Sequence, residues 1–144
     1  MNLKDIYTEL IMEHNQSKHN KGDLEGAQES VRGYNPYCGD DLTVNLIIED
    51  GIIKDVTYNG TGCAISEASA SIMIDLLKGG PVDEAKEKIK VFMDMIKDEV
   101  PDDVAEDVLE DASILSNIKH MPARVKCAVL AWHALEQGIE RIEA

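Results

Sequence analysis

The sequence predicts an α+β fold, with a small antiparallel three-stranded sheet and about five helices packed on one side of it. Three observations carry this prediction. Residues 42–60 hold two β-rich runs on either side of Asp50-Gly51, the pattern of a hairpin. One helix-like segment precedes the strands and four follow them. The order helix, strands, helices is typical of a sheet covered on one face.

Length and charge limit the function. The 144 residues are enough for one ordinary domain, which we expect to span residues 1–144. The formal net charge is −14. This charge repels phosphate backbones and anionic lipids, so we expect no nucleic acid and no membrane as partner. No secretory signal and no apolar run of transmembrane length is visible, so we expect a cytoplasmic protein.

The first predicted element is an amphipathic helix over about residues 3–15. Its apolar residues recur at helical spacing: Leu3, Ile6, Tyr7, Leu10 and Ile11. Residues 15–28, "NQSKHNKGDLEGAQ", are polar and predict a loop. A short strand is expected near residues 29–34.

The hairpin "LTVNLIIEDGIIKDVTYNG" allows its register to be argued. A two-residue loop at Asp50-Gly51 sets apolar residues opposite polar ones. A three-residue loop over 49–51 sets apolar residues together on one face, so we predict this loop, with Gly51 in the left-handed conformation as a bulge. The expected pairs are Ile48 with Ile52, Val44 with Val56, and Leu42 with Tyr58.

The helix after the hairpin is expected to begin with Ser66 as its cap and to run to about Lys78, where Gly79-Gly80-Pro81 ends it. Its first turns carry only small residues over 68–71, "ASAS", which allows close packing.

Two strongly charged helices are predicted over about residues 82–98 and 102–116, separated at Pro101. The last helix begins near Pro122, a favourable residue for a first turn. Its apolar residues form one buried stripe: Val125, Val129, Trp132, Leu135 and Ile139.

The three cysteines lie at three segment ends. Cys38 precedes the hairpin in "PYCGD" together with Asp40, Cys63 follows the hairpin, and Cys127 lies in the second turn of the last helix. A hairpin returns its outgoing strand beside the incoming one, so Cys38 and Cys63 emerge at one end of the sheet. Three thiolates and one carboxylate suit tetrahedral Zn²⁺, and thiolates also suit iron–sulfur clusters. Arg124, one turn before Cys127, would stabilise a thiolate or a bound anion.

Simpler interpretations stay open at this point. A single cysteine is more often a core residue than a ligand, Asp40 can be a turn residue, and Arg124 can be solvated. No serine elbow and no phosphate loop is present. The histidines have no paired metal spacing, and no HExxH occurs; they are His14, His19, His120 and His133. We expect His133 at the surface.

Three blocks, "NPYCGDDL", "GTGCAISEASASIM" and "MPARVKCAVLAW", resemble the signature blocks of the iron–sulfur cluster assembly proteins IscU and SufU, related to the amino-terminal part of NifU. The resemblance covers nearly the whole chain. It implies that Cys38, Asp40, Cys63 and Cys127 hold a zinc ion, or that the three cysteines hold iron in a [2Fe–2S] cluster.

Two departures from the IscU pattern favour the SufU branch. Lys126 stands directly before the third cysteine, where IscU has a histidine, and "MPARVK" replaces the chaperone motif. The acidic stretch over about residues 79–100 looks like the SufU insertion, and Arg124 matches the arginine of that branch. The resemblance thus implies a zinc-bound sulfurtransferase-type acceptor, not a stand-alone enzyme. Cys38 would receive persulfide sulfur from a pyridoxal-phosphate cysteine desulfurase of the SufS or IscS type.

Two alternatives remain beside the sulfur acceptor. The first is a scaffold on which a [2Fe–2S] cluster is assembled and passed to apo iron–sulfur proteins or further assembly factors; the missing histidine counts mildly against it. The second is a structural zinc protein with a closed four-ligand site. Such sites usually have paired Cys-x-x-Cys knuckles, and none occurs here.

Overall fold

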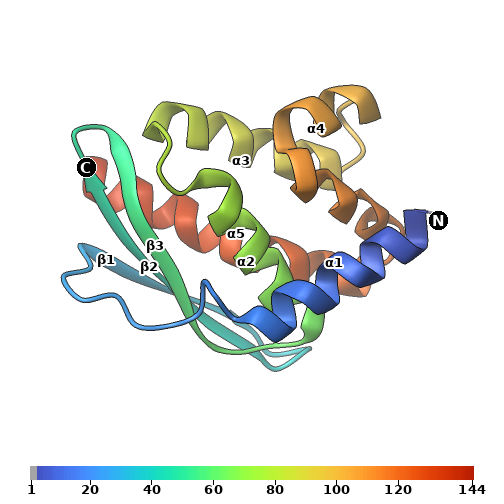
Figure 1. Ribbon diagram of the computed structural model, residues 1–144, viewed down its shortest axis with the longest axis horizontal. Coiled ribbons are helices and arrows are strands. Elements are labelled where there is room, and N and C mark those ends of the chain that lie inside the picture. Colours follow the sequence, from blue (N-terminus) through green and yellow to red (C-terminus); the bar gives the residue numbers. More distant parts are fainter. Residues whose placement is uncertain (1–2) are drawn as a thin grey trace.

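The computed structural model describes residues 3–144, and their side chains from residue 9 onward. It contains a three-stranded antiparallel sheet in the order β1-β2-β3 and five α-helices, which confirms the predicted fold class (Figure 1). The elements are α1 (Leu3–Ser17), β1 (Glu29–Asn35), β2 (Asp40–Glu49), β3 (Ile52–Thr61), α2 (Ala64–Leu77), α3 (Val82–Ile96), α4 (Asp102–Leu109), the 3₁₀ helix η1 (Glu110–His120) and α5 (Pro122–Glu143).

The long helix α5 lies across the sheet and packs on β1 and β2, while α2 packs beside α5 and α1 packs on α2 (Figure 1). Two glycines permit the close approach of α5. A Cβ at Gly33 of β1 would lie 3.0 Å from Leu130 Cγ, and one at Gly138 would lie 3.3 Å from Leu46 Cδ2. The strands present alternate residues to this helix, so Leu42, Val44 and Leu46 are buried.

The core is centred on Trp132 of α5. Its ring stacks on Phe92 of α3 with centroids 3.8 Å apart, and its Nε1 donates a hydrogen bond to Ser69 Oγ at 2.9 Å. Ser69 in turn donates to the carbonyl of Ala128 at 2.6 Å. All four small residues over 68–71 are buried, which confirms the close packing expected of α2.

The predicted apolar stripes agree with the burial of the described side chains. Trp132, Leu135 and Ile139 are buried, whereas Val125 and Val129 are half-buried against the core. In α1, Ile11 is buried and Leu10 packs against the core. The side chains of Leu3, Ile6 and Tyr7, which complete the predicted stripe of α1, lie outside the described residues.

The predicted loop of the hairpin is wrong. The turn has two residues, Asp50 and Gly51, with φ values of 53° and 74°, and Ile48 lies opposite Ile53. Positive φ at both positions is the mirror-image turn that matches the right-handed twist of strands. The left-handed conformation expected for Gly51 is present, but Asp50 shares it, and this makes the shorter loop possible.

The predicted pairs are also wrong, because a bulge shifts the register just beyond the turn, between Ile47 and Ile48 of β2. Leu46 then lies opposite Val56, and both are buried. The side chain of Asp55 accepts a hydrogen bond from the backbone N–H of Val56 at 2.8 Å, which satisfies this donor beside the bulge. Apolar residues therefore share one face, as expected. The bulge shifts the register so that apolar residues of both strands are buried although the turn has only two residues.

Two further predictions need correction. The cap of α2 is Cys63, not Ser66, since the Cys63 sulfur accepts a hydrogen bond from the backbone N–H of Ser66. The helix predicted over residues 102–116 is α4 followed by η1, because Glu110 adopts a positive φ of 51°. The buried residues of η1 recur every three positions, which suits a helix with three residues per turn; they are Ala112, Leu115 and Ile118.

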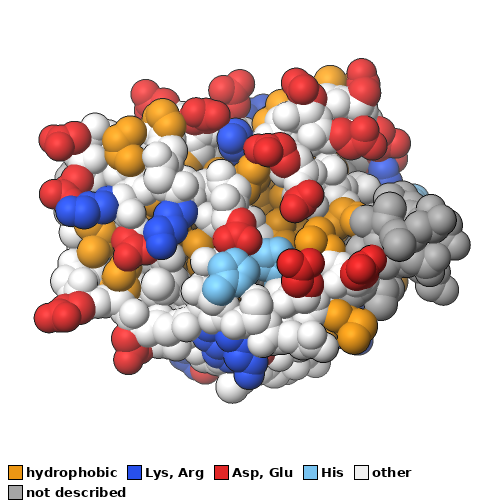
Figure 2. Space-filling view, in the orientation of Figure 1, with side chains coloured by type: hydrophobic (Ala, Val, Ile, Leu, Met, Phe, Trp, Pro, Cys, Tyr) orange, Lys and Arg blue, Asp and Glu red, His pale blue; other side chains and the backbone are white. Residues whose placement is uncertain are grey.

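No helix in the described part of the chain combines the length and the apolar character needed to cross a membrane. Figure 2 shows acidic side chains spread over one face, with fewer basic ones among them, as the net charge of −14 requires. An acidic surface of this kind favours cations over phosphate groups.

Candidate metal centre

Three segments meet at the end of the sheet where β1 turns into β2. Cys38 lies in that turn, Asp40 is the first residue of β2, and Cys63 lies between β3 and α2. Cys127 reaches the same place from the second turn of α5. The ligand atoms of Cys38, Asp40 and Cys127 lie within 4.8 Å of one another, and the two sulfurs are 3.1 Å apart.

Asp40 is fully buried in this cluster. Its Oδ1 accepts hydrogen bonds from the backbone N–H of Cys63 at 2.8 Å and from Ser66 Oγ at 3.0 Å. Its Oδ2 is buried and has no hydrogen-bond partner among the described residues. A buried carboxylate oxygen without a partner is costly, and a bound cation removes that cost. The residues therefore fit a metal ion.

Cys63 lies beside this cluster of three rather than in it. Its sulfur accepts the Ser66 N–H at 3.5 Å as the cap of α2, so the first amides of the helix face it. Cys63 is also close enough to Cys127 to influence its pKa. Four-ligand coordination thus requires the Cys63 side chain to move toward the other three.

Cys127 is fully buried at the base of the site. Burial raises the pKa of the Cys127 thiol well above its ordinary value, and the neighbouring Cys38 thiol and Asp40 carboxyl raise it further. Asn35 Nδ2 donates to its sulfur at 3.8 Å. Several groups that can become anionic share one pocket here, so they ionise together only when a positive charge compensates them.

Arg124 supplies positive charge at the exposed rim of the site. Its pKa is raised, chiefly by the charge of Cys63 and further by the neighbouring Cys127. The guanidinium therefore faces the thiols, in agreement with the predicted side of the helix. Lys126, in contrast, places its Nζ 4.8 Å from the ring centroid of Tyr37.

Sequence reasoning missed two residues that contact the cluster. Asn35 is buried and contacts Cys127, and Ser66 donates to Asp40 instead of capping α2. Both lie within the quoted blocks, in "NPYCGDDL" and "GTGCAISEASASIM", but only the folded chain assigns their partners. Gly62 leaves room for the hydrogen bond between Ser66 and Asp40. A Cβ at this position would collide with Ser66 Oγ and would lie 3.1 Å from Asp40 Oδ1.

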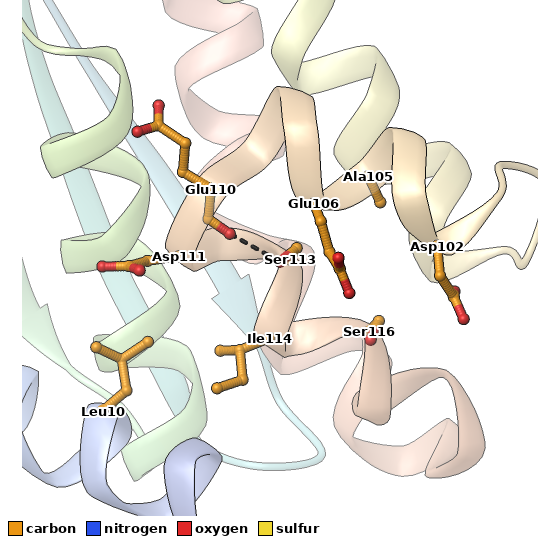
Figure 3. Close-up of a pocket in the computed structure, with 9 residues that line it drawn as sticks. All are labelled: Leu10, Asp102, Ala105, Glu106, Glu110, Asp111, Ser113, Ile114 and Ser116. Atoms are coloured by element: carbon orange, nitrogen blue, oxygen red, sulfur yellow. Dashed lines mark hydrogen bonds between the residues drawn. The ribbon is translucent and has the colours of Figure 1, made fainter. Parts of the chain in front are cut away.

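A separate acidic hollow of about 270 Å³ lies between α1, α4 and η1 (Figure 3). Its carboxylates come from Asp102, Glu106, Glu110 and Asp111. None of the cysteines lines it, and within the described residues its carboxylates do not converge into a cluster of metal ligands. The cysteine cluster is therefore the better candidate for chemistry.

Comparison with known proteins agrees with the resemblance in the three blocks. Residues 6–144 match the family described as the NifU-like N-terminal domain. An iron–sulfur cluster assembly scaffold protein IscU of Thermotoga maritima is 39% identical over 142 residues, covering 99% of this chain and 98% of that protein. A zinc-dependent sulfurtransferase SufU of Bacillus subtilis is 37% identical over 142 residues, covering 99% and 95%.

A solved structure extends the agreement to the fold. The iron–sulfur cluster assembly scaffold protein for the SUF system from Fervidobacterium islandicum superposes with a TM-score of 0.84 at 37% identity, covering 91% of this chain and 94% of that one. With the match over residues 6–144, the identities over 142 residues and this shared fold, the chain belongs to the family of NifU-like N-terminal domains, among relatives named IscU and SufU.

Proposed function

We propose that this protein is a cytoplasmic sulfur acceptor in iron–sulfur cluster assembly. Cys38 receives sulfur from the persulfide of a pyridoxal-phosphate cysteine desulfurase, and Cys38, Asp40, Cys63 and Cys127 hold zinc. The observation that carries the proposal is the pairing of a half-exposed thiol, Cys38, with a buried, unpartnered carboxylate oxygen of Asp40. The zinc-dependent sulfurtransferase among the relatives supports the choice of metal.

The transfer is a thiol exchange that leaves the number of electrons unchanged. The Cys38 thiolate attacks the outer sulfur of the donor persulfide, so that a new S–S bond forms on Cys38. The S–S bond of the donor breaks, and the donor cysteine leaves as a thiolate that can take up a proton. Cys38 then carries the sulfur as a persulfide for the next acceptor.

Residues of the chain prepare Cys38 for this attack. Gly39 has a φ of 72°, a conformation that favours glycine, so the loop can turn between Cys38 and Asp40. Arg124 stabilises thiolate charge at the rim, and the buried Cys127 and Asp40 anchor the site while Cys38 stays accessible. Bound zinc supplies the positive charge that keeps the thiols deprotonated and protected.

The donor enzyme has a nearby surface to contact. Tyr37 precedes the acceptor cysteine in the β1–β2 turn and is 85% exposed, and Tyr34, near the end of β1, is 56% exposed. Exposed tyrosines are frequent among the residues that dominate binding energy in interfaces. We assign this turn to contact with the desulfurase, and the delivered sulfur goes on to further assembly factors or apo iron–sulfur proteins.

A scaffold for a [2Fe–2S] cluster is the second candidate. The same three thiols and carboxylate can hold iron, and the relative from Thermotoga maritima is named a scaffold protein. One observation counts against the scaffold: the residue before Cys127 is Lys126 and not a histidine, so an imidazole ligand is missing there. The amine of Lys126 lies over the ring of Tyr37. A closed structural zinc site fits less well, because Cys38 is half-exposed.

The deciding experiment mixes the zinc-loaded protein with its cognate desulfurase and isotope-labelled cysteine, then maps labelled sulfur by mass spectrometry. We expect one added sulfur atom on the peptide that contains Cys38. The same sample supplied with iron tests the scaffold. Cluster formation and transfer to an apo-ferredoxin, with the desulfurase indifferent to Cys38, would establish the scaffold function instead.

Replacing Arg124 by alanine is expected to slow sulfur transfer several-fold without abolishing it. The change removes a charge that stabilises the thiolates of Cys63 and Cys127 and leaves the nucleophile in place. Initial rates of sulfide release in the presence of desulfurase and reductant measure the effect. Arg124→Lys, which keeps the charge, should recover part of the rate. Equal rates for the parent protein and both variants would show that Arg124 is a solvated surface residue without a role in sulfur transfer.

A further inference from the structure

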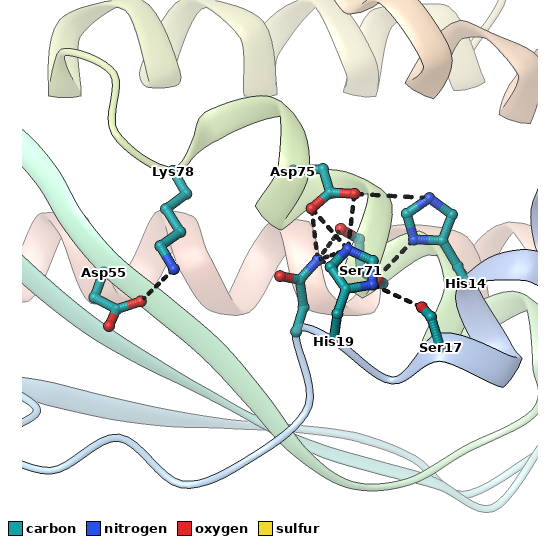
Figure 4. Close-up of polar contacts among 8 residues, drawn as sticks. His14, Ser17, His19, Asp55, Ser71, Asp75 and Lys78 are labelled. Carbon is teal, nitrogen blue, oxygen red and sulfur yellow. Dashed lines mark hydrogen bonds and ion pairs between the residues drawn. The ribbon is translucent and has the colours of Figure 1, made fainter.

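We propose a second divalent-metal site, formed by His14, His19 and Asp75, at the opposite end of α2 from the cysteines (Figure 4). His14 lies in the last turn of α1, His19 follows that helix, and Asp75 lies in the last turn of α2. At 1.5 Å per helical residue, Asp75 is roughly 18 Å along α2 from Cys63. The site is therefore separate from the cysteine cluster.

The three ligand groups converge. His19 Nε2 lies 3.0 Å from both oxygens of Asp75, and His14 Nε2 lies 3.9 Å from Asp75 Oδ2. One ligand atom from each residue fits within a set whose members are all within 4.8 Å of one another. In tetrahedral zinc sites, bonds of about 2.0–2.1 Å put neighbouring N and O ligands roughly 3.3 Å apart. Since the ligand atoms are at most 4.8 Å apart, side-chain shifts of up to about 1.5 Å complete the geometry.

Hydroxyl groups hold both imidazoles in the orientation that a metal requires. His14 Nδ1 is hydrogen-bonded to Ser71 Oγ at 2.7 Å, and His19 Nδ1 to Ser17 Oγ at 2.7 Å. The Nε2 atoms of both rings are thereby left facing Asp75 (Figure 4). Metal-binding histidines usually have the other ring nitrogen held by such a hydrogen bond, which sets the tautomer.

The charge around the site favours a cation. The nearby Lys78 pairs with Asp55 at 3.1 Å, and among the described residues Asp75 forms ion pairs with histidines only (Figure 4). Within residues 9–144, no lysine or arginine neutralises its carboxylate. A bound divalent cation would be attracted by the negative carboxylate of Asp75. The protein's net charge of −14 adds to this attraction.

Access and ligand type indicate which ions fit. The side chains of His19 and Asp75 are 47% and 48% exposed, so an ion and its water ligands can enter, whereas His14 is buried and fixed. Two imidazoles and a carboxylate suit Zn²⁺, Co²⁺, Ni²⁺ or Fe²⁺, with water in the remaining positions. Asn20 Nδ2, which donates to Asp75 Oδ1 at 2.9 Å, orients the carboxylate.

The competing interpretation is a polar network that only fastens the end of α1 to α2. Both the metal site and the polar network would stabilise the fold. Only a metal site would bind an ion through His14, His19 and Asp75. Co²⁺ separates them, because thiolate ligation adds charge-transfer absorption to its spectrum and N,O ligation does not. Co²⁺ is also paramagnetic and alters the NMR signals of nearby imidazoles.

The test titrates Co²⁺ into the full chain whose cysteine site is already filled with one zinc. We expect one further Co²⁺ per chain, visible-range bands without thiolate charge transfer, no zinc released, and selective broadening of the His14 and His19 imidazole signals. His120 and His133 serve as internal references. Asp75→Asn and His19→Gln, at half-exposed positions, should each weaken Co²⁺ binding at least tenfold.

The matched control is His133→Gln, which removes an exposed histidine elsewhere and should bind Co²⁺ like the parent. Circular dichroism and zinc content verify that the variants are folded. Absence of a second equivalent, cobalt bound only with thiolate bands, or equal binding by Asp75→Asn and the parent protein would each overturn the site. None of these outcomes depends on sulfur transfer, so the result stands apart from the proposed function.

Discussion

Replacing Cys38 by alanine is expected to abolish the acceleration that the zinc-loaded protein gives to its desulfurase. The acceptor must be a thiolate, and Cys38 is the thiol that combines partial exposure with a place in the cluster. Sulfide release from cysteine and a reductant should fall to the rate of the desulfurase alone. The rate is measured at several concentrations of the variant, so that weaker binding is distinguished from lost chemistry.

Cys38→Ser is the matched control, because serine keeps nearly the same size and a hydrogen-bonding atom. It should fail as completely as alanine, since a serine alkoxide is not available near neutral pH. Among the described residues, the Cys38 side chain forms hydrogen bonds only with the sulfur of Cys127 and the carbonyl of Ala123, so neither variant should unfold. Residual acceleration by Cys38→Ser would show that another thiol, or binding alone, drives the desulfurase.

The convergence of the cysteine segments could be predicted because it follows from topology. A hairpin must return its chain, so residues 38–40 and 63 have to meet whatever the exact register. The strand register, in contrast, depends on the backbone conformation of a single residue, Asp50, in the hairpin turn. Positive φ at a non-glycine residue, Asp50, together with the bulge beyond it, is rare enough that apolar matching alone selected the wrong loop.

Partners set by distant segments were harder to predict. Ser66 has the local pattern of a helix cap, yet its hydroxyl is drawn to Asp40, which lies 26 residues earlier, and Cys63 becomes the cap. His14 and His19 have no metal spacing because the helix ends between them, at Ser17, and their common partner Asp75 belongs to another helix. Only packing of α1 on α2 brings these three groups together.

Asp40→Asn is expected to stabilise the metal-free protein and to weaken zinc binding at least tenfold. Asparagine is isosteric, and its Oδ1 can still accept from the Cys63 N–H and from Ser66 Oγ. The change replaces the unpartnered buried oxygen by an amide donor, in a cluster that also contains the sulfurs of Cys38 and Cys127. Removing an unsatisfied buried charged atom contributes about 1–3 kcal/mol of unfolding free energy.

The two effects have opposite signs, which makes the result specific. In the presence of a chelator, Tm should rise by roughly 2–4 °C for each kcal/mol gained. With zinc, the variant should melt below the parent protein, because lost metal affinity is lost folding free energy. Calorimetry in both conditions measures the stability, and competition with a chromophoric chelator measures the zinc affinity.

Ser66→Ala, which removes one hydrogen bond from Asp40 Oδ1 without changing the ligand set, is the control. It should lower the stability of both forms. If Asp40→Asn did the same, the carboxylate would hold the β1–β2 turn in place and the metal would have to rely on the thiols alone.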